Sequence, residues 1–375
     1  MVIGFDGSRA FVDKKTGTEY YSYQLLKALA RIDKNNTYII YTRATITSTI
    51  VTSNVGLPNN FQIKEIRWFR LWTQGGLALQ TFKDNLDVLF VPSHTLPVIK
   101  KPGLKTVVTV HDLGSEYLPS MHQIKQRLYL GFMQKRQLKT ATKIIAVSKA
   151  TKQDLVRKIH IDEKKISVVY EGYDKEKFKV QSSKFKVSQI IKKYNLIYQN
   201  YFLFVGTVQP RKNLERLIEA FSHQSSAFRL IIAGSKGWMS DEIYKLPKKL
   251  GIEDRVKFLG YVPDEKLPAL YSGAIAFVFP SLFEGFGLPI LEAQACGCPV
   301  ITSNLSSMPE VGGPPAGGAA VYVNPYDIDD IVSGMGRIMN HELRIKLIKI
   351  GLENVKRFSW EKCARETLKV LESNT

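Results

Sequence analysis

The chain has 375 residues, of which 44% are hydrophobic and 11% aromatic, which is enough apolar material for two folded domains and excludes a disordered chain. The formal net charge is +19 and it is uneven, because residues 1–180 carry 29 basic and 15 acidic residues whereas residues 181–375 carry 24 and 19. The first part therefore has an excess of positive charge that suits nucleic acid, anionic lipid or phosphorylated substrates.

The N-terminus lacks the pattern of a signal peptide, and no apolar run reaches the roughly 18 residues of a membrane-spanning helix. We therefore expect a cytoplasmic protein whose membrane contact, if it has any, is peripheral and on the inner face of the plasma membrane. The three cysteines are Cys296, Cys298 and Cys363, an odd number that implies no disulfide framework and favours a reduced setting. No second cysteine pair or neighbouring histidine completes a metal site, so we expect no metal and no cofactor.

Short β-rich runs alternate with amphipathic stretches, a pattern typical of parallel α/β architecture. In the first half the predicted strands are Val2–Asp6, Tyr38–Tyr41, Asp87–Val91, Thr106–Val110, Ile144–Val147 and Ile166–Tyr170. Between the first two, Tyr20 to Ile32 has helical periodicity. In the second half the predicted strands are Tyr201–Val205, Arg229–Ala233, Val256–Leu259, Ala274–Phe279 and Pro299–Thr302.

The segment from Lys175 to Asn200 is polar, rich in lysine and serine, and weakly periodic, so it predicts a domain boundary. We expect a first domain over residues 1–180, a linker over 181–200, and a second domain over 201–357. The tail predicts successive helices, the last over residues 358–375, which we expect to pack back toward the first domain. Neither domain has Gly-x-Gly-x-x-Gly after its first strand, which argues against a nicotinamide or flavin enzyme.

The densest group of functional candidates follows the strand predicted at Ala274–Phe279. The chain there reads Glu-Gly-Phe-Gly-Leu-Pro-Ile-Leu-Glu from Glu284 to Glu292. Gly285 and Gly287 allow a tight turn with exposed N–H groups, and the proline fits the first turn of a helix, whose N-terminus binds anions. A diphosphate is expected there, with one carboxylate on sugar hydroxyls and the other on a ribose. For either glutamate alone, a helix cap or a solvated surface charge is the alternative.

This string resembles the Glu-x-seven-Glu signature of the retaining glycosyltransferases of the GT-B fold, in particular family four, which includes many mannosyl- and glucosyltransferases. The string Phe202–Leu214 resembles the family's opening of the second domain, where a basic pair contacts the donor diphosphate. The resemblance implies an α/β fold of two Rossmann-like domains facing across a cleft. It also implies a set of donor-binding residues: Gly17, Arg211, Glu284, Gly285, Phe286, Gly287, Leu288 and Glu292.

Lys212 has a chemical role that needs no family argument. A leaving nucleoside diphosphate gains negative charge in the transition state, and a fixed Lys/Arg clamp can accelerate its departure by roughly 10²–10³. The alternative is that Arg211 and Lys212 are a surface pair at a helix start, although cations there oppose the helix dipole. Many family members have Gly-Arg where this chain has Gly206-Thr207, so whether Arg211 replaces that charge is open.

In the first domain His111 follows an apolar strand, and the resemblance implies that it contacts the donor sugar; a structural histidine is the alternative. We therefore predict His111, Lys212 and Glu284 as catalytic residues. His94, Ser148 and Glu171 are predicted on the acceptor side or at the cleft; for Ser148 and Glu171 a helix cap and a turn are the alternatives. Gly17 follows the first strand, where family members approach the donor phosphates.

No acid occurs from Tyr117 to Gln153, a stretch that holds many basic residues, and Arg67-Trp68-Phe69-Arg70-Leu71-Trp72 adds basic and aromatic ones. Together they predict a surface for anionic lipid headgroups, with a packed helix bearing a lysine-rich outer face as the alternative.

The sequence thus predicts a retaining transferase that moves a hexose, mannose or glucose, from a nucleoside diphosphate sugar such as GDP-mannose to a glycan or lipid-linked acceptor in cell-surface polysaccharide or glycolipid synthesis. A sugar-nucleotide epimerase on the same fold is the first alternative. A nucleic-acid-binding module is the second, but the sequence lacks a recognised reading element, so no nucleic-acid partner is expected.

Overall fold

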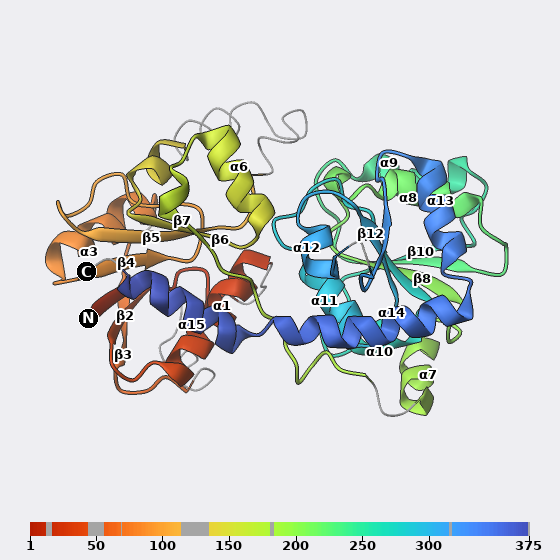
Figure 1. The fold of residues 1–375 in the computed structure, drawn as a ribbon, viewed down its shortest axis with the longest axis horizontal. Coiled ribbons are helices and arrows are strands. Elements are labelled where there is room, and N and C mark those ends of the chain that lie inside the picture. Colours follow the sequence, from red (N-terminus) through yellow and green to blue (C-terminus); the bar gives the residue numbers. More distant parts are fainter. Residues whose placement is uncertain are drawn as a thin grey trace. The chain divides into compact units, whose positions relative to one another are not determined.

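The structure is a computed structural model that describes residues 1–12, 17–43, 56–68, 70–113, 135–180, 184–314 and 317–373. The chain divides into two compact units, Met1–Gly172 with Phe358–Thr375 and Tyr173–Arg357 (Figure 1). The division falls after Gly172, earlier than the boundary expected at residue 180. The segment expected as a linker contains helix α7 (Lys184–Lys192), which packs against α10 (Leu267–Gly273) inside the second unit.

The first unit is built on a seven-stranded parallel sheet with strand order β3-β2-β1-β4-β5-β6-β7. Its strands are β1 (Val2–Asp6), β2 (Thr37–Arg43), β3 (Phe61–Ile66), β4 (Val88–Val91), β5 (Lys105–Val110), β6 (Lys143–Ala146) and β7 (Ile166–Val168). The central strands are buried almost throughout, which explains their nearly continuous apolar sequence, since helices cover both faces of such a sheet.

The helices of the first unit are α1 (Gly17–Ile32), a π-helical turn η1 (Thr73–Leu77) continued by α3 (Ala78–Lys83), α6 (Lys149–Ile159), a 3-10 turn η3 (Glu163–Lys165) and α15 (Trp360–Glu372). Figure 1 shows α1 and α15 side by side on one face of the sheet and α6 on the other. The C-terminal helix is fixed by Trp360, whose ring meets Tyr20 and Tyr21 of α1 edge-on at centroid distances of 6.0 and 5.9 Å. Gly172 passes so close to this helix that a Cβ there would lie 2.2 Å from the Trp360 nitrogen.

The second unit has a six-stranded parallel sheet with order β10-β9-β8-β11-β12-β13. Its strands are β8 (Tyr201–Val205), β9 (Arg229–Ala233), β10 (Val256–Gly260), β11 (Ala276–Phe279), β12 (Val300–Ser303) and β13 (Val321–Val323). Besides α7 and α10, its helical elements are η4 (Pro210–Lys212), α8 (Leu214–Ser222), α9 (Asp241–Lys249), α11 (Leu288–Ala295), α12 (Met308–Gly312), α13 (Ile328–Arg337), α14 (His341–Asn354) and η5 (Val355–Arg357). Figure 1 shows α8, α9 and α13 over one face of the sheet and α10, α11 and α14 over the other.

Both sheets reverse their strand order at one point. In the first unit β1 lies beside β4, and in the second β8 lies beside β11, so at these pairs the connections leave in opposite directions. The loops after the carboxyl ends of such strands separate and leave room for a ligand. Both units therefore have the layered architecture of Rossmann-like folds, with one preferred edge for a functional site.

Candidate functional site

A buried cluster of charges lies at the switch point of the second unit. The loop after β8 leads into the turn that carries Arg211 and Lys212, and the loop after β11 carries Glu284. Lys212 Nζ lies 2.6 Å from Glu284 Oε1, and Arg211 Nη1 lies 2.7 Å from Glu284 Oε2. Lys212 and Glu284 are each only 7% exposed. The structure therefore brings the predicted site residue Glu284 to Arg211 and Lys212, which lie more than seventy positions earlier in the sequence.

The cluster fixes the charge on Glu284. Burial alone would raise the pKa of this carboxyl, but the neighbouring charges of Arg211 and Lys212 outweigh it and hold the pKa at about 2. The Lys212 ammonium also lies 4.7 Å from the centre of the Phe279 ring, a favourable cation–π contact. Arg211 additionally donates to the carbonyl oxygen of Phe283 at 3.2 Å. These contacts give the two cations fixed positions at the strand ends.

Hydrogen bonds from two serines just before α12 hold the loop that carries Glu284 in place. Ser306 and Ser307 both donate to the carbonyl oxygen of Glu284, at 2.6 and 3.0 Å, and Ser307 also lies 2.7 Å from that of Phe286. Ser306 adopts a left-handed backbone with φ of 54°, an uncommon conformation for a residue other than glycine. Sequence reasoning missed both serines, because nothing in their local pattern distinguishes them from ordinary turn residues.

Helix α11 begins inside the string from Glu284 to Glu292, as the sequence predicts. Gly287 precedes its first residue with φ of 109°, a conformation that favours glycine, and no side chain caps the helix at this residue. Pro289 lies in its first turn, where a missing N–H removes no helical hydrogen bond. The positive end of α11 therefore points out of the sheet edge beside Glu284, as an anion-binding helix start requires.

Glu292 lies on α11 and makes a different contact from Glu284. The hydroxyl of Tyr271 on α10 donates to Glu292 Oε2 at 3.0 Å. Burial raises the pKa of Glu292 to about 7, with the charges of Asp264 and Asp174 adding to the rise. The two glutamates of the string therefore have opposite electrostatic environments. Cations hold Glu284 ionised, whereas Glu292 has a pKa close to neutral pH.

The predicted residues of the first unit also gather at the carboxyl edge of their sheet. His111 follows β5 and is buried; its Nδ1 lies 3.2 Å from Glu171 Oε1, and its Nε2 lies 3.1 Å from the carbonyl oxygen of Pro92. The ring of Tyr21 meets the imidazole edge-on at 4.6 Å. Both ring nitrogens of His111 therefore face acceptors of the protein, so in this structure the side chain links the ends of β4, β5 and β7.

His94 lies beside His111, with ring centroids 5.4 Å apart. Burial, reinforced by the neighbouring His111, lowers the pKa of His94 to about 4, so this ring is neutral near pH 7. Ser148 acts as the N-cap of α6, accepting a hydrogen bond from the Thr151 N–H at 3.0 Å. For Ser148 the helix-cap alternative thus describes its observed contact.

Gly17 is the first residue of α1. Gly17 is exposed, and a Cβ built on it would have none of the described atoms within 4 Å. In the same helical turn Glu19 accepts a hydrogen bond from Arg9 Nη1 at 2.7 Å, a pair that the sequence did not predict. Residues 13–16, which precede Gly17, lie outside the described residues, as do residues 114–134, which include the first part of the acid-free basic stretch from Tyr117 to Gln153.

The cysteines are free and buried, and burial raises the pKa of each thiol. Among the described residues no group of three or more His, Cys, Asp or Glu side chains is arranged to hold a metal ion. In the same part of the chain, none of the helices combines the length and apolar character that crossing a bilayer requires.

The fold and the cation–carboxylate cluster define a class, the glycosyltransferases with two Rossmann-like units of the GT-B type. Residues 187–353 match the family described as "Glycosyl transferases group 1", and residues 15–177 match "Glycosyltransferase Family 4". O-antigen chain mannosyltransferase B of Escherichia coli is 33% identical over 78% of this chain and 75% of its own length. O-antigen chain mannosyltransferase RfbU of Salmonella typhimurium is 31% identical over 69% of this chain and 65% of its own.

Solved structures agree on the fold. Sucrose-phosphate synthase from Thermosynechococcus elongatus superposes with a TM-score of 0.77 at 21% identity, covering 99% of this chain and 98% of that one. Anabaena Alr3699/HepE in complex with UDP and glucose also has a TM-score of 0.77, at 18% identity over the whole of both chains. The chain therefore belongs to glycosyltransferase family 4 and has the GT-B fold.

Proposed function

We propose that this glycosyltransferase moves a hexose, mannose from GDP-mannose, onto a glycan or lipid-linked acceptor in the synthesis of a cell-surface polysaccharide. The observation that carries the proposal is the buried Lys212–Glu284–Arg211 cluster at the switch point of the second unit. The names of the curated relatives, which are mannosyltransferases of O-antigen chains, support mannose and a polysaccharide acceptor.

The cluster suits departure of a diphosphate. In the structure one carboxylate pairs with two cations. A donor diphosphate brings further negative charge and competes for Arg211 and Lys212, while the start of α11 offers N–H groups and a positive dipole end. As the glycosidic bond breaks, the negative charge on the diphosphate grows, and cations already fixed at the site stabilise it without reorganising. Glu284, released from part of this pairing, becomes an acceptor for sugar hydroxyls.

We further propose that the reaction retains the anomeric configuration without a covalent glycosyl-enzyme. The charges of Arg211 and Lys212 hold the pKa of Glu284 at about 2, which makes it a weak base, and once the donor is bound its oxygens accept from sugar hydroxyls. Such a group is a weak nucleophile. No nucleophile from the protein is required if the diphosphate departs and the acceptor attacks on the same face of the sugar. The fixed cations then supply the charge stabilisation that a metal ion provides in metal-dependent enzymes.

A ligand screen followed by a transfer assay tests the proposal. GDP-mannose, UDP-glucose, UDP-galactose and UDP-N-acetylglucosamine are compared by thermal shift, where a donor at 100 times its dissociation constant should stabilise the protein by about 2.7 kcal/mol. The donor that stabilises is then incubated with and without acceptor glycans. Formation of an α-linked product from GDP-mannose is the expected result. Stabilisation by none of the four sugars, or conversion of donor alone into an epimer, contradicts the proposal.

A further inference from the structure

The exposed apolar side chains of the first unit are concentrated on one face. Among its described residues, every exposed large hydrophobic side chain lies between positions 68 and 99, and together they are Trp68 (46% exposed), Leu71 (71%), Leu79 (41%), Phe82 (50%), Val98 (46%) and Ile99 (69%). Isolated exposed hydrophobic residues are ordinary, but a contiguous group marks an interaction surface. We refer to these six residues as the apolar face.

Two segments build the apolar face, and hydrogen bonds join them. Leu79 and Phe82 lie three residues apart on α3, a spacing that places them on one side of the helix. Leu71 precedes η1 and has a left-handed backbone, with φ of 52°. The loop after β4 is attached to the same helix, because Gln74 Nε2 donates to the Leu96 carbonyl oxygen at 2.9 Å and its Oε1 accepts from the Val98 N–H at 2.8 Å. At the other end Lys101 N donates to Thr81 Oγ1 at 3.0 Å, so Val98 and Ile99 are held beside the helix.

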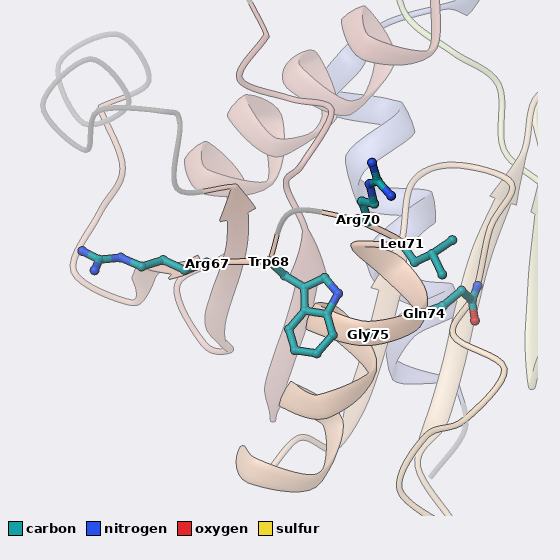
Figure 2. A pocket seen from close by; sticks show the side chains of 6 residues that line it. All are labelled: Arg67, Trp68, Arg70, Leu71, Gln74 and Gly75. Carbon is teal, nitrogen blue, oxygen red and sulfur yellow. The ribbon is translucent and has the colours of Figure 1, made fainter.

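Trp68 lies against the helical turn between Leu71 and Leu79. A Cβ built on Gly75, which lies between those two leucines on the helix, would approach the Trp68 indole to 2.4 Å. Glycine at this position thus lets the indole lie against the helix. Figure 2 shows the indole beside the turn that carries Gly75, with the side chains of Arg67 and Arg70 extending away from it. A hollow of about 570 Å³ lies next to the ring, lined by Arg67, Trp68, Arg70, Leu71, Gln74 and Gly75.

The charge around the apolar face has one sign. From residue 66 to 83 the chain has three basic residues, Arg67, Arg70 and Lys83, and no acid; from 88 to 111 it has Lys100, Lys101 and Lys105 and no acid. Two of the four acids that border these segments are engaged elsewhere, whereas Glu65, two positions before Arg67, is exposed. Asp84 accepts hydrogen bonds from Tyr41 and Lys64, and Asp87 from the backbone N–H of Val2.

We propose that the apolar face inserts into the interfacial region of a lipid bilayer that contains anionic headgroups. A rim of cations around exposed Trp, Leu, Phe and Ile side chains complements a surface that is apolar inside and negatively charged outside. A second copy of this chain would place the same cations against each other, which disfavours self-association through this face. No part of the proposal depends on residues 114–134. It deepens the proposed function by placing the lipid-linked acceptor at the surface that the first unit binds.

Flotation of the full-length protein with vesicles tests the proposal without any sugar donor, so its outcome is independent of the proposed reaction. The wild type should float with vesicles of phosphatidylcholine mixed with phosphatidylglycerol at low salt, remain unbound with phosphatidylcholine alone, and be released by high salt. Arg67→Gln with Arg70→Gln should weaken binding roughly 30-fold, at the free energy that basic residues near an anionic surface typically contribute. The matched control, Arg31→Gln with Lys34→Gln, changes the same charge on exposed residues of the same unit and should leave binding unchanged.

The apolar part is tested separately. Leu71→Gln with Phe82→Gln should weaken binding by roughly tenfold or more, because two side chains no longer transfer from water. Ile197→Gln with Ile345→Gln, at positions of similar exposure in the second unit, is the control and should bind as the wild type does. Equal thermal midpoints and circular dichroism spectra establish that all four variants are folded.

Insertion of Trp68 gives a direct signal. Brominated lipid should quench part of the tryptophan emission, and Trp68→Phe should abolish that part. Equal flotation with neutral and anionic vesicles, no flotation at low salt, no quenching attributable to Trp68, or equal losses in the paired and control variants would each overturn the proposal. Wild-type self-association that the Leu71/Phe82 variant removes, without an effect on flotation, would assign the face to a second copy instead.

Discussion

Replacement of Lys212 by methionine separates the stability of the charge cluster from its proposed catalytic role. Methionine keeps the length of the side chain and its contact with the Phe279 ring, but removes the cation that lies 2.6 Å from Glu284. The remaining cation, Arg211, still reaches the other carboxylate oxygen at 2.7 Å. Glu284 therefore keeps one charged partner, and the protein should fold.

The expected loss of stability follows from the pKa of Glu284. Because this pKa is about 2 instead of 4.5, the cluster contributes about 3 kcal/mol at neutral pH, as an order of magnitude. If each cation supplies about half, the variant loses roughly 1–2 kcal/mol, or about 2–8 °C in the melting temperature of a unit of this size. The pKa of Glu284 also rises, so acid unfolding of the variant should begin at a higher pH.

The expected loss of activity is larger. A fixed cation that stabilises the leaving group typically contributes a factor of about 10²–10³ in turnover, or roughly 3–4 kcal/mol of transition-state stabilisation. Transfer of labelled hexose at saturating donor measures it, with differential scanning calorimetry on the same preparation. Lys245→Met, at an exposed position of the second unit, is the control and should change neither. A Lys212→Met protein that melts a few degrees lower but turns over like the wild type would falsify the mechanistic role of Lys212.

Three further predictions concern pH, capping and metal. Because burial raises the pKa of Glu292 from 4.5 to about 7, the folded state binds more protons than the unfolded chain between these values, so stability should fall by up to about 3 kcal/mol as pH rises through this range. Urea unfolding of Glu292→Gln should show a flatter profile, whereas Glu353→Gln, at an exposed position, should keep the wild-type slope. Ser148→Ala should cost about 1 kcal/mol of stability through the lost helix cap, as should Ser359→Ala at the cap of α15, and neither should change donor affinity if the serine only caps. EDTA should leave transfer activity largely intact; loss restored by manganese or magnesium would contradict the metal-free proposal.

Much of the fold follows from local sequence, because strands of a covered parallel sheet are nearly continuous apolar runs. β1, β8 and β9 have the predicted bounds, and the remaining predicted strands differ by a few residues at their ends. The sequence missed β3, an edge strand whose Gln, Lys and Glu side chains interrupt the apolar pattern, and β13, which has only three residues. Edge strands carry a weak signal because one side is open to solvent.

The sequence suggests candidate residues for the site but not the contacts that they make. The string from Glu284 to Glu292 and the basic pair lie on loops at the switch point of the second unit, where α/β proteins usually bind ligands, and their role in donor binding stays a prediction. Their pairing could not be read from sequence, because whether Arg211 reaches Glu284 depends on the distance between two loops after adjacent strands. The same holds for His111, whose partners Glu171 and Pro92 lie on other strands and are brought together only by the sheet order.

Gly17 offers a last test, because the protein itself leaves room at this position. A methyl group there would meet no atom of the described residues within 4 Å, and the backbone is helical, so Gly17→Ala should not strain the fold. Any loss of donor affinity must then come from a clash with the ligand. If the donor diphosphate passes this helix start as the family resemblance implies, affinity should drop roughly tenfold or more, the value of a hydrogen bond to a charged group.

The control for this test is Gly336→Ala, inside α13, where a Cβ would likewise meet no atom within 4 Å. That variant should be more stable by up to about 1 kcal/mol, since alanine favours a helix, and should bind donor as the wild type does. Titration calorimetry with the donor found by thermal shift compares the two. Unchanged affinity in Gly17→Ala would remove Gly17 from the donor site and confine diphosphate recognition to Arg211, Lys212 and the start of α11, since Glu19 already neutralises Arg9 at the start of α1.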